Sequence, residues 1–321
     1  MLRVLVPSIL ALTLSSVALA QTPAPAPAAA APFVRPPAPG RMIDIGGRKL
    51  HILCKGQGKG PTVIFEAGLS QYLAVSTYAK VQDLVAPYAR ACVYDRAGLG
   101  WSDPNPGVTS HQSMVADLHS LLRGAGIKGP IILVGHSMGG LTARLYAKTY
   151  PKEVAGMVLA DASTEANFAL PDFDSSNASM IAQIEAGLTK GVPGQPMVPL
   201  PAGTAYDISM AFTPEVFRTV KAEYVALTLV PAAMKQPHAY GTLGAKPLVI
   251  LRRGQAASPP NADDIWWRTQ QEKELSLSTN SQLVVAEKSG HTIPYEAPDL
   301  TAAAVRRVLD AVRTHGKLAA P

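Results

Sequence analysis

The sequence predicts an α/β protein in which a mostly parallel β-sheet carries α-helices on both faces. Short apolar runs rich in Val, Ile and Leu recur from about residue 61 to residue 286, and such unbroken runs are typical of strands buried on both faces of a parallel sheet. Apolar residues at helical spacing lie between several of these runs. Two earlier runs are separated by Gly46-Gly47-Arg48, which predicts an opening hairpin. A hairpin followed by alternating strands and helices indicates an α/β sheet.

The strands and helices are expected in a regular order along the chain. Apolar residues from Met114 to Leu122 repeat at helical spacing and end before Gly124, and those from Leu300 to Val312 repeat in the same way. Each segment therefore predicts an amphipathic helix that packs on the sheet. The hairpin strands are expected over Arg41–Ile45 and Lys49–Cys54, and the other strands over Pro61–Phe65, Ala89–Tyr94, Ile131–Val134, Met157–Ala160, Leu248–Leu251 and Gln282–Ala286.

Residues 165–245 interrupt this alternation. They contain helical patterns and Pro/Gly turns but no convincing strand pattern, and a stretch of roughly 80 residues is too long for a plain loop in a compact domain. We expect a mostly helical insertion, a lid, above the carboxyl edge of the sheet. The lid divides the main domain into residues 41–164 and 246–321.

The first 20 residues have the pattern of an export signal. Arg3 precedes a largely apolar stretch, and the segment ends in Ala-Leu-Ala at residues 18–20, as at a signal cleavage site. A membrane anchor is the alternative, but Pro7 shortens an apolar stretch that needs about 20 residues to span a bilayer. Residues 21–40 are rich in Pro and Ala and predict a semi-extended linker. We therefore expect a secreted or periplasmic protein without a membrane span in its mature form.

The composition excludes several classes of protein. The chain of 321 residues is 47% hydrophobic and 16% charged, which is too apolar for a disordered chain. Its 29 Lys and Arg residues against 23 Asp and Glu give a net charge of +6, but no run of like charges concentrates this excess. A nucleic-acid-binding surface is therefore not indicated. The two cysteines are too few for a disulfide-built scaffold.

The strongest indication of function is the sequence G-H-S-M-G-G at residues 135–140. A buried strand is expected before it and a helix after it, which is the context of a nucleophile elbow. In such an elbow, glycines allow close packing around a strained serine, and the turn presents the hydroxyl beside the positive end of the following helix. Ser137 is therefore the predicted nucleophile, with a plain structural turn as the alternative.

A serine nucleophile needs a general base, and His291 is the predicted one among seven histidines. It lies five residues beyond the last expected strand, at the same edge of the sheet as Ser137. A histidine that only stabilises its own loop is the alternative. His136 is expected to pack within the elbow, and His238, in the expected lid, is a candidate to contact the substrate.

The third member of the triad is the acid that orients the imidazole and stabilises its charged form. Asp161 directly follows the strand Met157–Ala160, and an acid at a strand end is held rigidly. Asp263 is the alternative, because it lies beyond the strand at residues 248–251, but it must fold back from a loop. We favour Asp161, whose other interpretation is a loop cap.

An oxyanion hole needs backbone N–H groups directed at the developing negative charge. Met138, directly after the expected nucleophile, is one predicted donor. The other is Leu69, in the loop after the third strand, where Gly68 allows the backbone to turn sharply. The alternative for this loop is a plain glycine turn.

At these residues the chain resembles the α/β-hydrolase-fold serine hydrolases, a large family that includes esterases, lipases and peroxidase-like members. The resemblance extends from about residue 41 to residue 312. It rests on G-H-S-M-G-G at residues 135–140, on Y-D-R-A-G-L-G-W-S at residues 94–102 and on S-G-H at residues 289–291. It implies the α/β-hydrolase fold, with a mostly parallel eight-stranded sheet, helices on both faces and a helical lid insertion.

The chain departs from the family pattern at two positions. It has Ala67-Gly68 where members often have His-Gly in the oxyanion loop. The acid usual after the seventh strand is absent, which is why the acid is assigned to Asp161, a placement that some relatives also use. The resemblance also makes the second strand an antiparallel neighbour of the fourth, so Cys54 and Cys92 are candidates for a disulfide in an oxidising compartment. Two buried free thiols are the alternative.

The resemblance implies a carboxylesterase-like enzyme that acts on a small-molecule or lipid-like ester through an acyl-enzyme and needs no metal or organic cofactor. Tyr72, near the oxyanion loop, is expected to contact this substrate. A serine nucleophile rather than an aspartate disfavours haloalkane dehalogenase and epoxide hydrolase chemistry on the same fold. Amide cleavage, carbon–carbon hydrolysis and perhydrolysis use the same triad and stay open, as does a non-catalytic binding protein on this fold.

Overall fold

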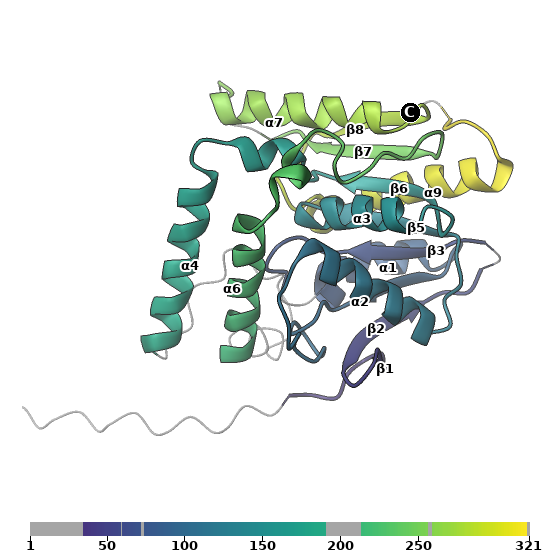
Figure 1. Ribbon diagram of the computed structural model, residues 1–321. Coiled ribbons are helices and arrows are strands. Elements are labelled where there is room, and N and C mark those ends of the chain that lie inside the picture. The colour runs from purple at the N-terminus through teal and green to yellow at the C-terminus, as the bar shows by residue number, and fades with distance from the viewer. Residues whose placement is uncertain (1–34, 59, 72–73, 191–212, 256–258, 320–321) are drawn as a thin grey trace, which may run out of the picture. The chain divides into compact units, whose positions relative to one another are not determined.

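The described strands form one eight-stranded sheet in the order β1-β2-β4-β3-β5-β6-β7-β8 (Figure 1). β1 pairs antiparallel with β2 and β2 antiparallel with β4, whereas every other pair is parallel. This arrangement confirms the predicted hairpin and the mostly parallel sheet. The strands are β1 (Arg41–Asp44), β2 (Lys49–Lys55), β3 (Thr62–Glu66), β4 (Ala91–Tyr94), β5 (Ile131–His136), β6 (Val154–Ala160), β7 (Leu248–Arg253) and β8 (Ser281–Ala286).

The computed structural model describes residues 35–58, 60–71, 74–190, 213–255 and 259–319. The expected export signal, most of the expected linker and the substrate-contacting candidate Tyr72 lie outside these residues.

Helices cover both faces of the sheet. α2 (His111–Gly124) and α3 (Met138–Thr149) lie in front of it in Figure 1, and α1 (Ala74–Val85) and α9 (Pro298–Thr314) lie behind it. Each pair of helices packs together and against strands, so the sheet separates two hydrophobic cores. The two helices predicted from apolar periodicity correspond to α2 and α9, which confirms them.

β5 illustrates why the unbroken apolar runs form this sheet. All six of its residues are buried, and successive side chains point to opposite faces of a strand. Ile131 and Leu133 therefore belong to the core under α2 and α3, whereas Ile132 and Val134 belong to the core under α1 and α9. Because both faces of the strand are covered, apolar side chains are needed on both, and they form an unbroken run in the sequence from Ile131 to Val134.

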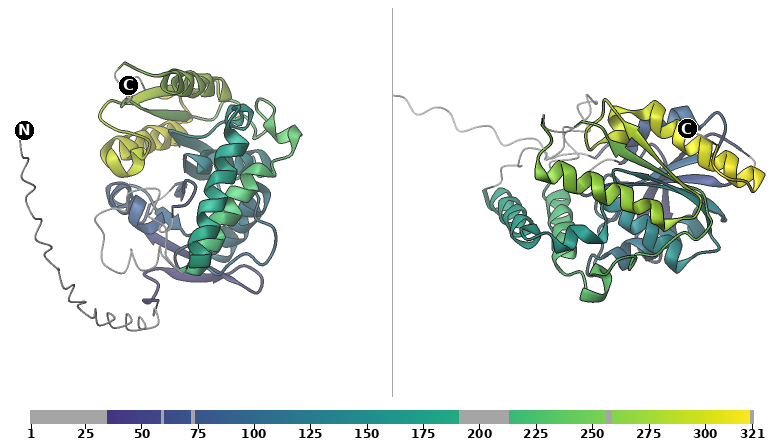
Figure 2. Two further views of the ribbon diagram at one scale, coloured as in Figure 1. Left: turned by 90° about the vertical axis from the view of Figure 1, so that its left-hand side faces the viewer. Right: turned by 90° about the horizontal axis from the view of Figure 1, so that it is seen from above.

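Between β6 and β7, the described part of the chain contains helices and no strand. Helix α6 (Pro214–Thr228) begins after Thr213, whose hydroxyl accepts a hydrogen bond from the N–H of Val216 at 3.3 Å and so caps the helix. Helices α4 (Phe173–Lys190) and α6 lie side by side at one end of the sheet (Figure 2).

None of the helices in the described ranges is long and apolar enough to cross a lipid bilayer. The segment between β6 and β7 comprises η1 (Glu165–Ala169), α4 (Phe173–Lys190), α6 (Pro214–Thr228) and η2 (Ala232–Lys235), and the later elements are α7 (Ala262–Lys273), η3 (Glu274–Leu277) and α8 (Ile293–Glu296).

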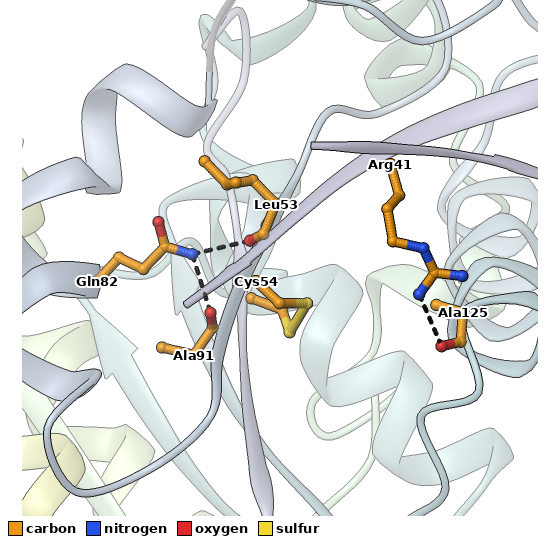
Figure 3. The surroundings of a disulfide bond; sticks show 7 residues. Arg41, Leu53, Cys54, Gln82, Ala91 and Ala125 are labelled. Carbon is orange, nitrogen blue, oxygen red and sulfur yellow. Dashed lines mark hydrogen bonds between the residues drawn. A yellow bond between two sulfur atoms is a disulfide. The ribbon is translucent and has the colours of Figure 1, made fainter. Parts of the chain in front are cut away.

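A disulfide joins β2 to β4. Cys54 and Cys92 lie directly opposite each other in the antiparallel pair, and their sulfur atoms are bonded (Figure 3). Of the two possibilities that the sequence left open, the structure therefore contains the bridge. Beside it, the side-chain amide of Gln82 on α1 donates to the carbonyl of Leu53 at 2.8 Å and to that of Ala91 at 2.9 Å, which ties the helix to both strands.

Candidate active site

Ser137 lies in a sharp turn between β5 and α3. Its backbone has φ 51° and ψ −128°, a conformation that non-glycine residues rarely adopt. The turn is close to its neighbours: a Cβ atom at Gly135 would lie 2.7 Å from the Cα atom of Gly140, and one at Gly139 would lie 2.4 Å from the carbonyl oxygen of Glu66. Glycine is therefore required at both positions, as in a nucleophile elbow.

The structure brings Ser137, His291 and Asp161 into one chain of hydrogen bonds. Nδ1 of His291 lies 2.7 Å from Oδ2 of Asp161, and Nε2 of His291 lies 3.0 Å from Oγ of Ser137. An ionised carboxylate only accepts hydrogen bonds, so Nδ1 carries the proton and Nε2 is left to accept from the serine hydroxyl. The imidazole side chain is 41% exposed, whereas the carboxylate is fully buried. The arrangement allows the imidazole to remove the hydroxyl proton.

Four donors surround the carboxylate of Asp161. Besides His291, they are the backbone N–H and the guanidinium Nη1 of Arg253, both at 3.1 Å, and the indole N–H of Trp267 at 2.9 Å. Burial alone would raise the pKa of Asp161, but the hydrogen bond and charge of His291, together with the hydrogen bonds from Trp267 and Arg253, lower it below its ordinary value. The carboxylate therefore stays ionised beside the imidazole.

The alternative acid, Asp263, occupies a different environment. It lies in the exposed first turn of α7, and the carboxylate within hydrogen-bond distance of His291 Nδ1 is that of Asp161. The neighbouring Asp264 is 4.0 Å from the guanidinium of Arg253. The end of β6 thus supplies the acid that contacts the histidine.

The loop after β3 lies against the elbow. A Cβ atom at Gly68 would be 3.2 Å from Cβ of Ser137, so the backbone of this loop passes directly beside the serine. The guanidinium of Arg96 donates to the carbonyls of Ala67 at 2.6 Å and Gly68 at 2.7 Å and so holds the loop in place. Of the two predicted oxyanion donors, Leu69 directly follows Gly68 in this loop, and Met138 is the first residue of α3.

A buried network of charged side chains, formed by Arg96, Glu66 and Glu223, contacts the loop after β3. Nε of Arg96 donates to Glu223 of α6 at 2.7 Å, and Glu223 also accepts from the N–H of Ser70 at 3.1 Å. Glu66 accepts a hydrogen bond from the hydroxyl of Tyr94, and burial raises the pKa of Glu66 to about 7 despite the nearby Arg96. Glu223 therefore connects α6, in the helical segment between β6 and β7, to the loop after β3.

Of the two residues expected to contact substrate, His238 lies within the described part of the chain. It lines a cavity of about 680 Å³ together with Arg144, Glu165 and Glu274, and neither Ser137 nor His291 belongs to the lining. Tyr72 lies outside the described residues. Within the part of the chain that the structure describes, no group of three His, Cys, Asp or Glu side chains is placed to hold a metal ion.

The sequence did not predict the contacts that three further residues make around the triad. Trp267 and Arg253 bond to the carboxylate of Asp161, and Gln71 bonds to the loop after β3 at the N–H of Gly68. No motif marks these residues, because they meet the site only through the folding of distant segments.

Comparisons with known proteins agree with the fold. A model of the alpha/beta hydrolase family matches residues 63–304. The chain belongs to the alpha/beta hydrolase family. Over 155 residues it is 40% identical to an uncharacterized protein of Schizosaccharomyces pombe, a match that covers 40% of this chain and only 29% of that protein.

Solved structures of alpha/beta hydrolase folds superpose on most of the chain. A thermophilic esterase from Thermogutta terrifontis has a TM-score of 0.63 and 24% identity, and the match covers 83% of this chain and 94% of that one. An epoxide hydrolase from metagenomes of hot environments has a TM-score of 0.66 and 19% identity, over 84% of this chain and 97% of that one. At these identities the likeness establishes the fold, and the chemistry has to be argued from the site.

Proposed function

We propose that the protein is an exported serine hydrolase that cleaves carboxylic esters of small-molecule or lipid-like substrates. The observation that carries the proposal is the hydrogen-bond chain from Ser137 through His291 to Asp161. The buried carboxylate of Asp161 keeps the proton of the imidazole on Nδ1, so Nε2 is free to accept the proton of the serine hydroxyl, as nucleophilic catalysis requires.

The reaction follows from these positions. Oγ of Ser137 attacks the ester carbonyl while Nε2 of His291 takes the hydroxyl proton, and the backbone N–H groups of Leu69 and Met138 hold the negative oxygen. His291 then gives its proton to the departing alcohol, which leaves an acyl group on Ser137. Water attacks this acyl-enzyme, His291 removes a proton from the water, and the acid leaves as the serine regains its proton. Asp161 stays ionised throughout and stabilises the imidazolium.

The nucleophile distinguishes this proposal from the chemistry named for one of the similar structures. Epoxide hydrolases on this fold use a carboxylate nucleophile, as the resemblance to the family implies, whereas the elbow of this chain carries Ser137. Ester cleavage needs a nucleophile, a base and donors to the oxyanion, and Ser137, the imidazole of His291 and the two proposed N–H groups would supply them.

Hydrolysis of a panel of p-nitrophenyl esters from acetate to decanoate, with matched anilides, tests the proposal. The wild-type protein should hydrolyse esters, and Ser137→Ala should lose at least about 10³-fold in kcat/KM with an unchanged melting temperature. Undiminished ester hydrolysis by Ser137→Ala would reject this site. Faster cleavage of the anilides would make the protein an amidase, and binding without turnover would make it a binding protein.

Export is the second part of the proposal and is supported by the pattern of residues 1–20. Mass spectrometry of the protein recovered from the periplasm or the medium should give a mature chain that starts at Gln21. A chain recovered with Met1 intact from the membrane fraction would instead favour the anchor.

A further inference from the structure

Two buried polar side chains that the reaction does not use connect the loop after β3 to the loop of His291. The N–H of Gly68 donates to Oε1 of Gln71 at 2.7 Å, Nε2 of Gln71 lies 3.2 Å from Nδ1 of His136, and Nε2 of His136 lies 2.8 Å from the carbonyl oxygen of His291. Gln71 is 5% exposed and His136 is 2% exposed. These three hydrogen bonds are called the relay below.

The two backbone ends of the relay fix the direction of every hydrogen bond in it. A backbone N–H only donates, so the side chain of Gln71 must present its oxygen to Gly68 and its amide N–H to His136. Nδ1 of His136 therefore accepts, and the single proton of the neutral ring lies on Nε2. The carbonyl of His291 only accepts, and Nε2 donates to it. All three bonds run in one direction without a conflict.

The relay requires a neutral imidazole. Burial, together with the charge of His291, lowers the pKa of His136 to about 3. A proton on Nδ1 would place two donors face to face between His136 and Gln71. The second histidine of the site therefore stays neutral while the first one changes its charge during catalysis.

We propose that Gln71 and His136 are positioning residues, which set the backbone of His291 relative to the loop that carries Leu69. This inference rests on the proposed function. The general base and one oxyanion donor come from loops more than 200 residues apart in the sequence, and both must be placed within a fraction of an ångström of the reacting atoms. The relay links both loops through the residue that precedes Ser137.

The contacts of the loop support this role. A Cβ atom at Gly68 would lie 2.8 Å from Nδ1 of His136, so the loop and the ring are in direct contact. The rings of His136 and His291 have centroids 4.9 Å apart. A displacement of the His136 ring would therefore shift both His291 and the loop after β3.

Four variants test the relay. His136→Ala removes it, Gln71→Met keeps the volume but removes the bonds to Gly68 and His136, and His136→Gln extends an amide N–H to about the position of Nε2 and keeps the bond to His291. His111→Ala is the matched control: His111 is also a buried histidine, 3% exposed, and it bonds to Thr142 at 3.1 Å on α3.

For a good ester substrate, His136→Ala and Gln71→Met should lower kcat by about tenfold to a hundredfold and change KM less than threefold, because misplacement by about 1 Å can cost this much. His136→Gln should recover part of the loss in kcat. His111→Ala, with a similar loss of melting temperature, should keep the wild-type kcat. Equal kcat values for His136→Ala and His111→Ala would overturn the role of His136.

A spectrum of the wild-type protein separates a failure of the relay from a failure of the proposed function. With ¹⁵N-labelled histidine, His136 should have an unprotonated Nδ1 and a protonated Nε2 at every pH from 5 to 8. A proton on Nδ1 would overturn the relay in an active enzyme. The expected tautomer in a protein that hydrolyses no ester would reject the proposed function and the catalytic part of the inference, while the link between the loops would stand.

Discussion

The substitution Asp161→Asn should abolish most of the ester hydrolysis without unfolding the protein. In the structure, Oδ1 of Asp161 accepts from the N–H of Arg253 at 3.1 Å and from Trp267 at 2.9 Å, while Oδ2 accepts from His291 at 2.7 Å and from the Arg253 guanidinium at 3.1 Å. Asparagine has one oxygen and one NH₂ group for these four donors. In either orientation, the NH₂ group of the asparagine faces two other donors. We expect the orientation with the asparagine oxygen in place of Oδ1, because it keeps the hydrogen bonds from the Arg253 backbone and the Trp267 indole, whose positions are fixed. The NH₂ group then faces His291 and the Arg253 guanidinium.

The size of the expected loss of activity in Asp161→Asn follows from the tautomer of His291. With the NH₂ group of the asparagine facing it, Nδ1 must accept a hydrogen bond, so the ring proton moves to Nε2 and the ring cannot accept the proton of Ser137. A reversed tautomer in a Ser-His-Asp triad costs about 10⁴ in kcat, which corresponds to about 5 kcal/mol of transition-state stabilisation. We therefore expect kcat/KM to fall by about 10³- to 10⁴-fold.

The assay is the hydrolysis of p-nitrophenyl butyrate, with circular dichroism to check that the variant is folded. Asp263→Asn is the control, because Asp263 lies in the exposed first turn of α7, and it should change kcat/KM less than about twofold. If Asp161→Asn stayed within tenfold of the wild type, or if Asp263→Asn lost as much activity, the assignment of the acid would be refuted.

Three further predictions concern stability and the elbow. Burial raises the pKa of Glu66 from 4.5 to about 7, so the folded protein holds a proton that the unfolded chain releases. The contribution of Glu66 to the free energy of unfolding should therefore fall by about 3 kcal/mol as the pH rises from 4.5 to 7. Urea titrations of the wild type and of Glu66→Gln should find that the difference between their free energies of unfolding falls by this amount over that range. Replacing Cys54 and Cys92 together by Ser removes a crosslink of 38 residues and should lower the free energy of unfolding by about 4 kcal/mol; an unchanged denaturation midpoint would contradict this. In Gly139→Ala the new methyl group would lie 2.4 Å from the carbonyl oxygen of Glu66, so the melting temperature and kcat should both fall, and wild-type values would disprove the close packing of the elbow.

The sequence was sufficient to predict the sheet because each strand has a pattern of its own. All eight expected strands are present within three residues at their ends, and the strand before Ser137 is buried at every position. The hydrogen-bonded group of Ser137, His291 and Asp161 was also predictable, because each of them lies at the carboxyl end of a parallel strand or just beyond it. Parallel strands bring such positions to one edge of the sheet.

The supporting residues were not predictable, because no local pattern specifies them. Trp267 reaches Asp161 across 106 residues of sequence, and Gln71 reaches His136 across 65. His136 was expected only to pack, since a buried histidine beside a serine gives no indication of which groups its nitrogens will face. His238, expected to contact substrate, lines a cavity whose lining does not include Ser137.

The central claim is that His291 activates the hydroxyl of Ser137, and labelling with a fluorophosphonate tests it most directly. Peptide mass spectrometry of the labelled wild-type protein should locate one phosphonyl group, on Ser137, and the second-order rate constant for labelling should fall by at least about 10³-fold in His291→Ala. A protein that hydrolyses esters but carries the label on another residue, or labels equally fast without the imidazole, would contradict the claim.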